Sequence, residues 1–442
     1  MNLRDIKALV FQRSWLTLSG AATVFIVPHT LSSIEQGLFF TFLSLAAIQS
    51  IFEAGITSAF FNYVAHERAI LTNTSPLPTD AERHRSEVRI SCLLKMARHW
   101  FILLAIAFAI LVGGFGYLFI DSTLQREQLS LAWGAPFFIL ISSISLSLHN
   151  LSKIPVLEGY GLISNVAKFR LRSSVFSSVV MWTIMVSGGG VWALGIGHAA
   201  QTVSMAWQIT KAYKKLDLPT VSNFGDVGSD RLRWKKDIFP LQSRLAASYF
   251  LGYFIAQAVV PYVLHTQGAV AAGQIGLLLS VFSALASIIA SYMYAAGPRY
   301  ATLIARNDFK SLGALYQKVT FVTIAAACLV YFLLFCAIGL AKYFDLSVSH
   351  RIPDMSVTMW FVLIGLVNAY VGSAATLLRA QKKEPMLPVS AIVAFGYVTA
   401  MFMLNGSASK YLFMVFALVQ LALALPLTMA VLKKSKLLNY AR

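Results

Sequence analysis

The chain has 442 residues, of which 57% are hydrophobic and only 12% are charged, about half of the roughly 25% found in soluble domains. This composition excludes a water-soluble globular enzyme, a disordered chain and a coiled coil, and it indicates a polytopic membrane protein. Cytoplasmic loops explain the net charge of +18 better than nucleic-acid binding does, because Lys and Arg concentrate on the cytoplasmic side of membrane helices.

Stretches that are free or nearly free of charge predict twelve membrane-spanning helices, since one crossing needs roughly 20 apolar residues. Two stretches are too long for a single crossing, and residues 188–190 and 265–268 divide them. The predicted fold class is therefore an all-α integral membrane protein. In chain order the stretches are 14–34, 36–64, 100–120, 128–152, 173–210 (two helices), 245–298 (two helices), 319–341, 355–378, 385–404 and 411–432.

The distribution of positive charge predicts the orientation of these helices. With a cytoplasmic N-terminus, 32 of the 36 Lys and Arg residues fall in inner segments. The four outer cations are Arg126, Lys342, Arg351 and Lys410. This asymmetry follows the positive-inside rule, and one missed crossing would scramble it. We expect both termini to be cytoplasmic.

A basic polar segment, residues 211–240, follows the sixth predicted helix and contains two prolines and two glycines. It predicts a cytoplasmic linker between two six-helix lobes, residues 1–210 and 241–442. Six crossings return the chain to the same side, so similar lobes would be related by a pseudo-two-fold axis along the membrane normal. Two such lobes can rock and open a central cleft to alternate sides of the membrane.

Glu53 is a carboxylate within the second apolar stretch, with Gln49 and Thr57 one turn away on the same face. A charge at that depth costs about 3 kcal/mol on insertion scales, so it must face the bundle or a hydrated cavity. We interpret Glu53, with Gln49, as a coupling-ion or gating site. The alternative is a structural carboxylate. The nearby His66-Glu67-Arg68 is expected to be solvated.

Further polar residues near helix ends are candidates for substrate binding. Arg13 and Arg244 lie one turn inside their helices, where they would offer guanidinium groups to a phosphate-bearing ligand. The alternative for them is snorkelling to the interface. Four polar residues share one face of the seventh helix and could bind sugars, or could equally hydrogen-bond to neighbouring helices. They are Gln242, Tyr249, Tyr253 and Gln257.

Motifs for metal or nucleotide binding are absent from the sequence. The eight His and three Cys residues lack metal-ligand spacing, and there is no phosphate-binding loop and no metalloprotease or nucleophile-elbow motif. The sequence therefore predicts no cofactor and no metal. Energy for transport would come from an ion gradient, such as H⁺ or Na⁺, or from the substrate gradient.

Several motifs in both halves resemble those of O-antigen and related polysaccharide flippases, of the multidrug/oligosaccharidyl-lipid/polysaccharide superfamily. The motifs are LSSIEQGLFFTFLSL at 31–45, QSIFEAGI at 49–56, VLEGYG at 156–161 with Arg170, and AGQIGLLLS at 272–280. The resemblance implies two six-helix lobes, and it places Glu53, Glu158, Arg170, Gln267 and Gln274 in family-like motifs. We expect Glu158 and Arg170 to form a cytoplasmic loop motif and Gln274 to contact substrate. Ala54 and Phe309 depart from the family pattern, which affects the subfamily and substrate more than the fold.

The resemblance implies a flippase that carries a polyprenyl-diphosphate-linked oligosaccharide across a bacterial inner membrane, working beside a glycan polymerase and chain-length machinery, and not an enzyme. One alternative is a multidrug or cation antiporter, which would favour several carboxylates at membrane depth. Another is a membrane glycan polymerase, ligase or acyltransferase. Such enzymes usually need a large outer loop with catalytic residues, and the longest predicted outer loop here is short.

Overall fold

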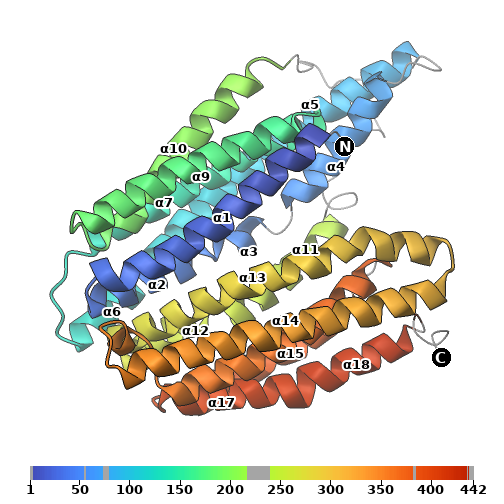
Figure 1. The fold of residues 1–442 in the computed structure, drawn as a ribbon. Coiled ribbons are helices and arrows are strands. Elements are labelled where there is room, and N and C mark those ends of the chain that lie inside the picture. The colour runs from blue at the N-terminus through green and yellow to red at the C-terminus, as the bar shows by residue number, and fades with distance from the viewer. Residues whose placement is uncertain are drawn as a thin grey trace. The chain divides into compact units, whose positions relative to one another are not determined.

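The computed structural model describes residues 3–53, 56–72, 79–216, 239–381, 385–435 and 437. Within these ranges the protein is built from helices and contains no β-strand (Figure 1). The helices up to residue 213 are α1 (Leu3–Thr30), α2 (Ser33–Ala46), α3 (Gln49–Glu53), α4 (Ile56–Thr72), α5 (Asp80–Phe108), the π-helical η1 (Ala109–Phe115), α6 (Gly116–Arg126), α7 (Gly134–Leu151), α8 (Ile154–Gly159), α9 (Ile163–Val186) and α10 (Trp192–Tyr213).

The second part of the chain has the same all-helical character. Its elements are α11 (Phe239–Ala256), α12 (Val259–Gln267), α13 (Ala269–Ala305), α14 (Phe309–Tyr343), the short 3₁₀ helix η4 (Ser349–Arg351), α15 (Met355–Arg379), α16 (Leu387–Met403), α17 (Ser409–Val419), the π-helical η5 (Gln420–Ala424) and α18 (Leu425–Lys434).

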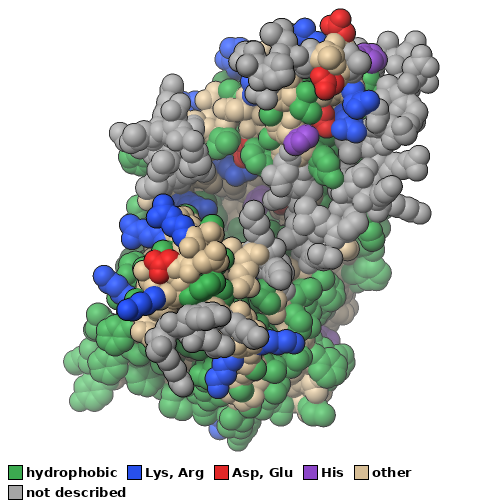
Figure 2. Space-filling view, turned by 90° about the vertical axis from the view of Figure 1, so that its right-hand side faces the viewer, with side chains coloured by type: hydrophobic (Ala, Val, Ile, Leu, Met, Phe, Trp, Pro, Cys, Tyr) green, Lys and Arg blue, Asp and Glu red, His purple; other side chains and the backbone are tan. Residues whose placement is uncertain are grey.

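The protein is a multi-pass membrane protein. Among the described residues, eight spans are long and apolar enough to cross a bilayer, each made of one helix or of two or three consecutive helical segments. Large hydrophobic side chains are exposed on them, for example Phe321 and Phe332 of α14, and hydrophobic side chains cover much of the face in Figure 2. Exposed apolar surface of this extent suits a lipid environment. Every predicted stretch overlaps a helix, while twelve crossings remain a prediction.

Both predicted breaks are confirmed, and glycine explains each of them. Gly188 and Gly190 have positive φ angles of 79° and 54° between α9 and α10, and Gly268 has a φ of 91° between α12 and α13. These backbone conformations favour glycine because it has no Cβ. The chain can therefore turn there.

Several helices begin or end outside the apolar stretches that predicted them. α5 begins at Asp80, twenty residues before the predicted residue 100, because a capping box closes its first turn. Thr79 accepts a hydrogen bond from the backbone N–H of Glu82, and Glu82 accepts one from the backbone N–H of Thr79. The charges between residues 82 and 98 therefore lie on a helix. Hydropathy cannot detect such an extension.

The chain divides into two compact units, unit 1 with residues 1–19 and 45–250 and unit 2 with residues 20–44 and 251–442. Residues 20–44, assigned from the sequence to the N-terminal lobe, group with the C-terminal helices. The greater part of the predicted linker, residues 217–238, lies outside the described residues.

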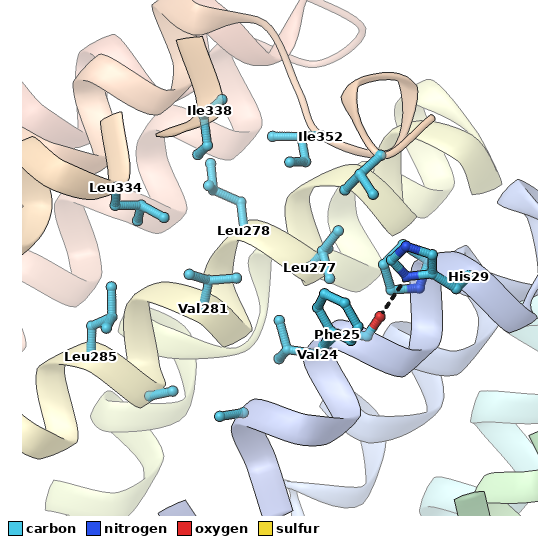
Figure 3. Close-up of a pocket in the computed structure, with 14 residues that line it drawn as sticks. Val24, Phe25, His29, Leu277, Leu278, Val281, Leu285, Leu334, Ile338 and Ile352 are labelled. Carbon is cyan, nitrogen blue, oxygen red and sulfur yellow. Dashed lines mark hydrogen bonds between the residues drawn. The ribbon is translucent and has the colours of Figure 1, made fainter. Parts of the chain in front are cut away.

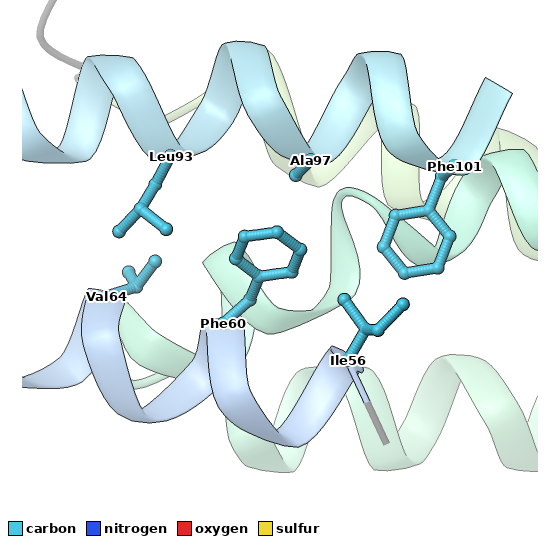
Figure 4. Packing of buried hydrophobic residues seen from close by; sticks show 6 residues of the cluster. All are labelled: Ile56, Phe60, Val64, Leu93, Ala97 and Phe101. Atoms are coloured by element: carbon cyan, nitrogen blue, oxygen red, sulfur yellow. The ribbon is translucent and has the colours of Figure 1, made fainter. Parts of the chain in front are cut away.

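In unit 1, α10 packs against α7 and α9 (Figure 1), and α4 packs against α5. Ile56, Phe60 and Val64 recur every four residues on α4 and meet a matching row of α5, Leu93, Ala97 and Phe101 (Figure 4). All six side chains are buried. Rows spaced by four residues form the ridges that let two helices interlock.

In unit 2, α2 crosses α13 at very short range. A Cβ on Gly37 would lie 2.0 Å from the carbonyl oxygen of Ala269, and one on Gly276 would lie 2.3 Å from Cβ of Phe40. Only glycine allows these two backbones to approach so closely. The buried amide of Gln36 strengthens the crossing by donating to the carbonyl of Gly273 at 2.9 Å. These contacts explain why residues 20–44 belong to unit 2.

Candidate functional site

Glu53 ends the short helix α3, and Thr57 at the start of α4 donates its hydroxyl to Oε1 of Glu53. The carboxylate is half-buried, and Gln49 lies at the start of the same short helix. The hydrogen bond agrees with the expectation that Thr57 lies beside Glu53, but the prediction of one continuous helix was wrong. α2 ends at Ala46, and Ser50 donates its hydroxyl to the carbonyl of Ala47. Serine side chains compete in this way with helical backbone bonds.

Glu158 and Arg170 form an ion pair, with 3.3 Å between Nη2 of Arg170 and Oε1 of Glu158. Glu158 lies on α8 and Arg170 on α9, and Glu158 also interacts electrostatically with Glu53. Two features that the sequence indicated separately, the carboxylate of Glu53 and the loop motif, are therefore neighbours within unit 1. We call Glu53, Glu158 and Arg170 the carboxylate–arginine cluster.

The glycines of the motif around Glu158 have identifiable structural causes. A Cβ on Gly159 would lie 2.6 Å from Cγ1 of Val64, so α8 can approach α4 only without a side chain there. Gly161 has a φ of 83°, which favours glycine. Between them, the ring of Tyr160 lies 4.7 Å beneath the guanidinium of Arg68, a cation–π contact. The motif thus fixes Glu158 against α4.

A second ion pair in unit 1, between Arg89 and Glu67, connects α5 with α4. Nη1 of Arg89 lies 3.1 Å from Oε1 of Glu67, whose side chain is only 4% exposed. The prediction that Glu67 would be solvated was wrong, because α5 extends far enough to bring Arg89 over it. Buried carboxylates require such a partner. The pair joins α4 to α5. This structural contact explains why a carboxylate is buried at Glu67, without a role in transport.

The carboxylate–arginine cluster has one negative charge more than it has positive charges. Two carboxylates near one guanidinium repel each other, and binding of a proton or a monovalent cation relieves that repulsion. Ionisable groups at membrane depth are costly and commonly mark ion or proton pathways. A coupling-ion role for Glu53 remains a prediction, and the structure adds Glu158 as a neighbouring carboxylate.

Unit 2 contains a cavity of about 290 Å³, and Gln257 lies in its wall. Gln257 falls in the break between α11 and α12, where its carbonyl accepts the hydroxyl of Ser44 at 2.5 Å. The helix break directs the residue into the cavity region instead of continuing α11. Gln257 therefore lies in the wall of a cavity, and its role in binding remains a prediction. The residue does not share an uninterrupted helix with Tyr253.

Aromatic rings dominate the wall of this cavity. Tyr397 stacks on Phe416 with ring centroids 3.9 Å apart, and Phe282 stacks on Tyr331 at 5.0 Å. Gln420 donates to the hydroxyl of Tyr397 at 3.1 Å and orients its ring. The described wall also carries polar side chains without formal charge, Gln257, Ser283 and Asn368, and it carries neither a carboxylate nor a cation.

The other predicted substrate-binding residues are distributed over several places. Gln242 is buried on α11 with its Oε1 unpaired, whereas Tyr249, on the same helix, is 44% exposed. The carbonyl of Tyr253 accepts hydrogen bonds from the backbone of both Gln257 and Ala258 at the helix break. Tyr253 therefore defines the end of α11.

Arg13 is exposed on α1. Arg244 lies on α11, but its side chain falls outside the described residues. Gln274 donates its amide to the carbonyl of His350 at 3.0 Å, which ties α13 to η4. The observed contact of Gln274 is thus within the protein.

Two groups of residues escaped the sequence analysis. One is the aromatic wall of the cavity, whose members come from α13 to α17 and share no local motif. The other is a group of basic residues that lie close together, Arg98 on α5, His149 in the last turn of α7 and Lys153 just before α8. Only the basic character of the neighbouring loops could have indicated the second group.

No protein-family model matches the sequence, and no curated protein matches it. Solved structures do match. The lipid II flippase MurJ in an inward closed conformation superimposes with a TM-score of 0.67 at 12% identity, covering 100% of this chain and 90% of that chain. An inward-facing multidrug resistance MATE family transporter of the MOP superfamily gives 0.61 at 14% identity, covering 95% and 99%.

A third match is a MOP superfamily transporter from Pyrococcus furiosus, with a TM-score of 0.53 at 13% identity, covering 98% of this chain and 95% of that chain. Identities this low establish the fold alone. The protein has the fold of transporters of the multidrug/oligosaccharidyl-lipid/polysaccharide (MOP) superfamily. The resemblance inferred from its motifs is confirmed at the level of this fold.

Proposed function

We propose that the protein is a flippase that moves a polyprenyl-diphosphate-linked oligosaccharide from the cytoplasmic to the periplasmic leaflet of a bacterial inner membrane. Sugars and a diphosphate cannot cross hydrocarbon unaided, because each polar group would lose its hydration. A polar cleft in the protein would replace that hydration and would open to alternate sides of the membrane. The polyprenyl tail would stay in lipid.

The neutral aromatic cavity of unit 2 is the observation that carries this proposal. Sugars are uncharged polyols, and their recognition requires hydrogen bonds from amides and hydroxyls together with apolar ring faces. Asn368, Gln257 and Ser283 offer the former, and rings such as Tyr331 offer the latter. A carboxylate, which would favour an organic cation over a sugar, is absent from the described wall of the cavity.

The carboxylate–arginine cluster supplies a mechanism of coupling within the same proposal. Loading Glu53 or Glu158 with a proton or Na⁺ would lower the repulsion between α3 and α8. A ligand shifts a conformational equilibrium by its differential affinity for the two states. Ion binding would thereby favour one access state over the other.

Transport by purified protein in proteoliposomes tests the proposal. A lipid-linked oligosaccharide is placed in one leaflet, and its appearance in the other is read by a membrane-impermeant glycosidase. We expect translocation above the rate of protein-free vesicles. Translocation of an organic cation such as ethidium, with none of the lipid-linked sugar, would instead establish the antiporter.

The double substitution Arg13→Ala, Arg244→Ala provides a test in cells. We expect surface-glycan export to be abolished while the amount of protein in the membrane stays unchanged, because the diphosphate would lose both guanidinium partners. Exposed cations that form no substrate contact tolerate such changes. Normal export by the double variant would remove the two arginines from the mechanism.

A further inference from the structure

A second cavity in unit 2 lies outside the site described above. It has a volume of about 340 Å³ and is lined by α1, α13 and α14 together with Val348 and Ile352 (Figure 3). Val24, Leu278 and Ile338 represent the three helices in its wall, and they point toward the common space in Figure 3. We call this cavity the apolar groove.

The wall of the groove is almost entirely hydrocarbon. Its most polar side chain is His29, whose Nδ1 donates to the carbonyl of Phe25 at 2.8 Å and so leaves only Nε2 available. Phe25 itself is largely exposed, and α13 and α14 are apolar enough to span a membrane. A groove of this kind gains nothing from water and favours a hydrocarbon chain.

Two cations lie beside one part of this wall. Nζ of Lys342 lies 3.4 Å from the carbonyl oxygen of Ile352, a lining residue. Arg351 precedes Ile352 in the chain, and its Nη1 donates to the hydroxyl of Ser33 at 2.9 Å. The groove thus combines an apolar channel with a positively charged end.

Neither cation is neutralised within the described part of the chain. Lys342 and Arg351 form no ion pair there, and the nearby carboxylate of Asp345 pairs with His350 at 3.1 Å. Lys and Arg normally avoid the outer side of a membrane protein. Only four are predicted there, and two of the four have their side chains beside Ile352 and Ser33 at this end of the groove.

We infer that the apolar groove binds the polyprenyl chain of the translocated lipid and that Lys342 and Arg351 bind its diphosphate on the outer side. This inference rests on the proposed function. It assigns a separate subsite to the lipid moiety, distinct from the aromatic cavity that would hold sugars. A lysine and an arginine together can offer donors to both phosphates.

The dimensions favour a polyprenyl lipid over a bilayer phospholipid. The volume is near the lower end of the roughly 300–1,000 Å³ of ligand pockets, which suits a section of one chain more than two acyl chains side by side. A diphosphate also carries more negative charge than a phosphodiester, which matches two cations. Because Lys342 and Arg351 are predicted to lie on the outer side, the groove would hold the lipid after translocation. From there the lipid would leave into the outer leaflet.

Binding measurements on the full-length protein in detergent test this inference, with a sugar-free long-chain polyprenyl diphosphate as the probe. Phosphatidylglycerol and inorganic diphosphate serve as competitors. Ala284→Phe places a ring in the groove, and Lys342→Gln removes one charge. The matched controls are Ala295→Phe on the exposed surface of the same helix, away from the groove, and Lys410→Gln at another predicted outer cation.

We expect each groove variant to weaken probe binding about tenfold or more, and each control to bind like the wild type. Lys342→Gln keeps the test decisive if Ala284→Phe fails to fold. Wild-type affinity in a folded groove variant would overturn the inference, as would equal competition by phosphatidylglycerol, which indicates an ordinary lipid site. Binding of inorganic diphosphate as tight as that of the polyprenyl diphosphate would overturn the role of the groove.

The transport assay separates this inference from the proposed function. If the wild-type protein does not translocate lipid-linked sugar, the proposed function fails. If the wild type translocates it, and the folded Ala284→Phe and Lys342→Gln variants do so at the same rate and bind the probe equally well, only the groove inference fails.

Discussion

Arg170 is 39% exposed and Glu158 is 19% exposed, so their ion pair is only partly shielded from water. Pairs between exposed side chains contribute little, whereas a charge left alone in a shielded place is costly. Glu53 adds a second carboxylate close to Glu158. The arginine is therefore needed to keep two negative charges close together, and its loss should affect both folding and coupling.

Arg170→Met should lower the thermal stability of the purified protein and abolish transport, because Glu158 and Glu53 would then face each other without a cation. Adding Glu158→Gln should restore much of the stability but not the transport. Thermal unfolding measured by tryptophan fluorescence checks both variants. Arg83→Met, at the exposed pair with Glu87, is the matched control and should change neither property. Equal stability of Arg170→Met and the control would contradict this account.

Glu53→Gln should remove the response of transport to an imposed ion gradient while the amount of folded protein stays unchanged. Glutamine retains an oxygen that can accept the hydroxyl of Thr57 but cannot gain or lose a proton. Initial rates in proteoliposomes with and without a proton or Na⁺ gradient check the prediction. Glu53→Asp keeps a carboxylate and should retain the response. A gradient response in Glu53→Gln equal to that of the wild type would exclude the residue from coupling.

At the scale of elements, close approaches between helices hold the charged residues in place. Gly159 lets α8 contact α4, and Gly37 lets α2 contact α13. Neither contact can be inferred from hydropathy, since glycine adds almost nothing to it. The same residue type also marks the breaks at Gly188 and Gly268, where a positive φ is required. Glycine therefore has two roles here, and only the breaks were predictable.

Gly159→Ala should destabilise the protein by about 1–3 kcal/mol, the usual cost of overpacking, because the new Cβ would lie 2.6 Å from Cγ1 of Val64. The displaced α8 would also carry Glu158 away from Arg170, so transport should fall. Gly252→Ala is the matched control, since nothing lies within 4 Å of a Cβ there, and alanine favours a helix. Denaturation in mild detergent compares the two. Similar stability of both variants would refute the close-contact explanation.

At the scale of the whole molecule, the alternation of charge predicts a topology that labelling can test. In a background without Cys92, Cys328 and Cys336, single cysteines at Lys215 and Arg306 should be protected from an impermeant thiol reagent in intact cells. Cysteines at Asp345 and Gly406 should react. All four positions are exposed. Reaction at Lys215 or protection at Asp345 would invalidate the predicted orientation and with it the outer position of the apolar groove.

The sequence by itself determined the helical stretches, the two glycine breaks and the candidate charges. Each of these depends on properties that neighbouring residues carry locally, such as apolar length, a positive φ or a charge within an apolar run. It identified Glu53 as a charge within an apolar stretch, and it identified Glu158 and Arg170 through motifs that resemble those of a known family.

Only the tertiary structure decided which of these residues meet. It placed Glu53 beside Glu158 and assigned residues 20–44 to unit 2. It also assembled the aromatic cavity from α11 to α17, and the apolar groove from α1, α13 and α14 with the segment after α14. Such groupings depend on how side chains far apart in the chain fill space against one another. Contacts of that kind are set by packing between helices, and no local pattern encodes them.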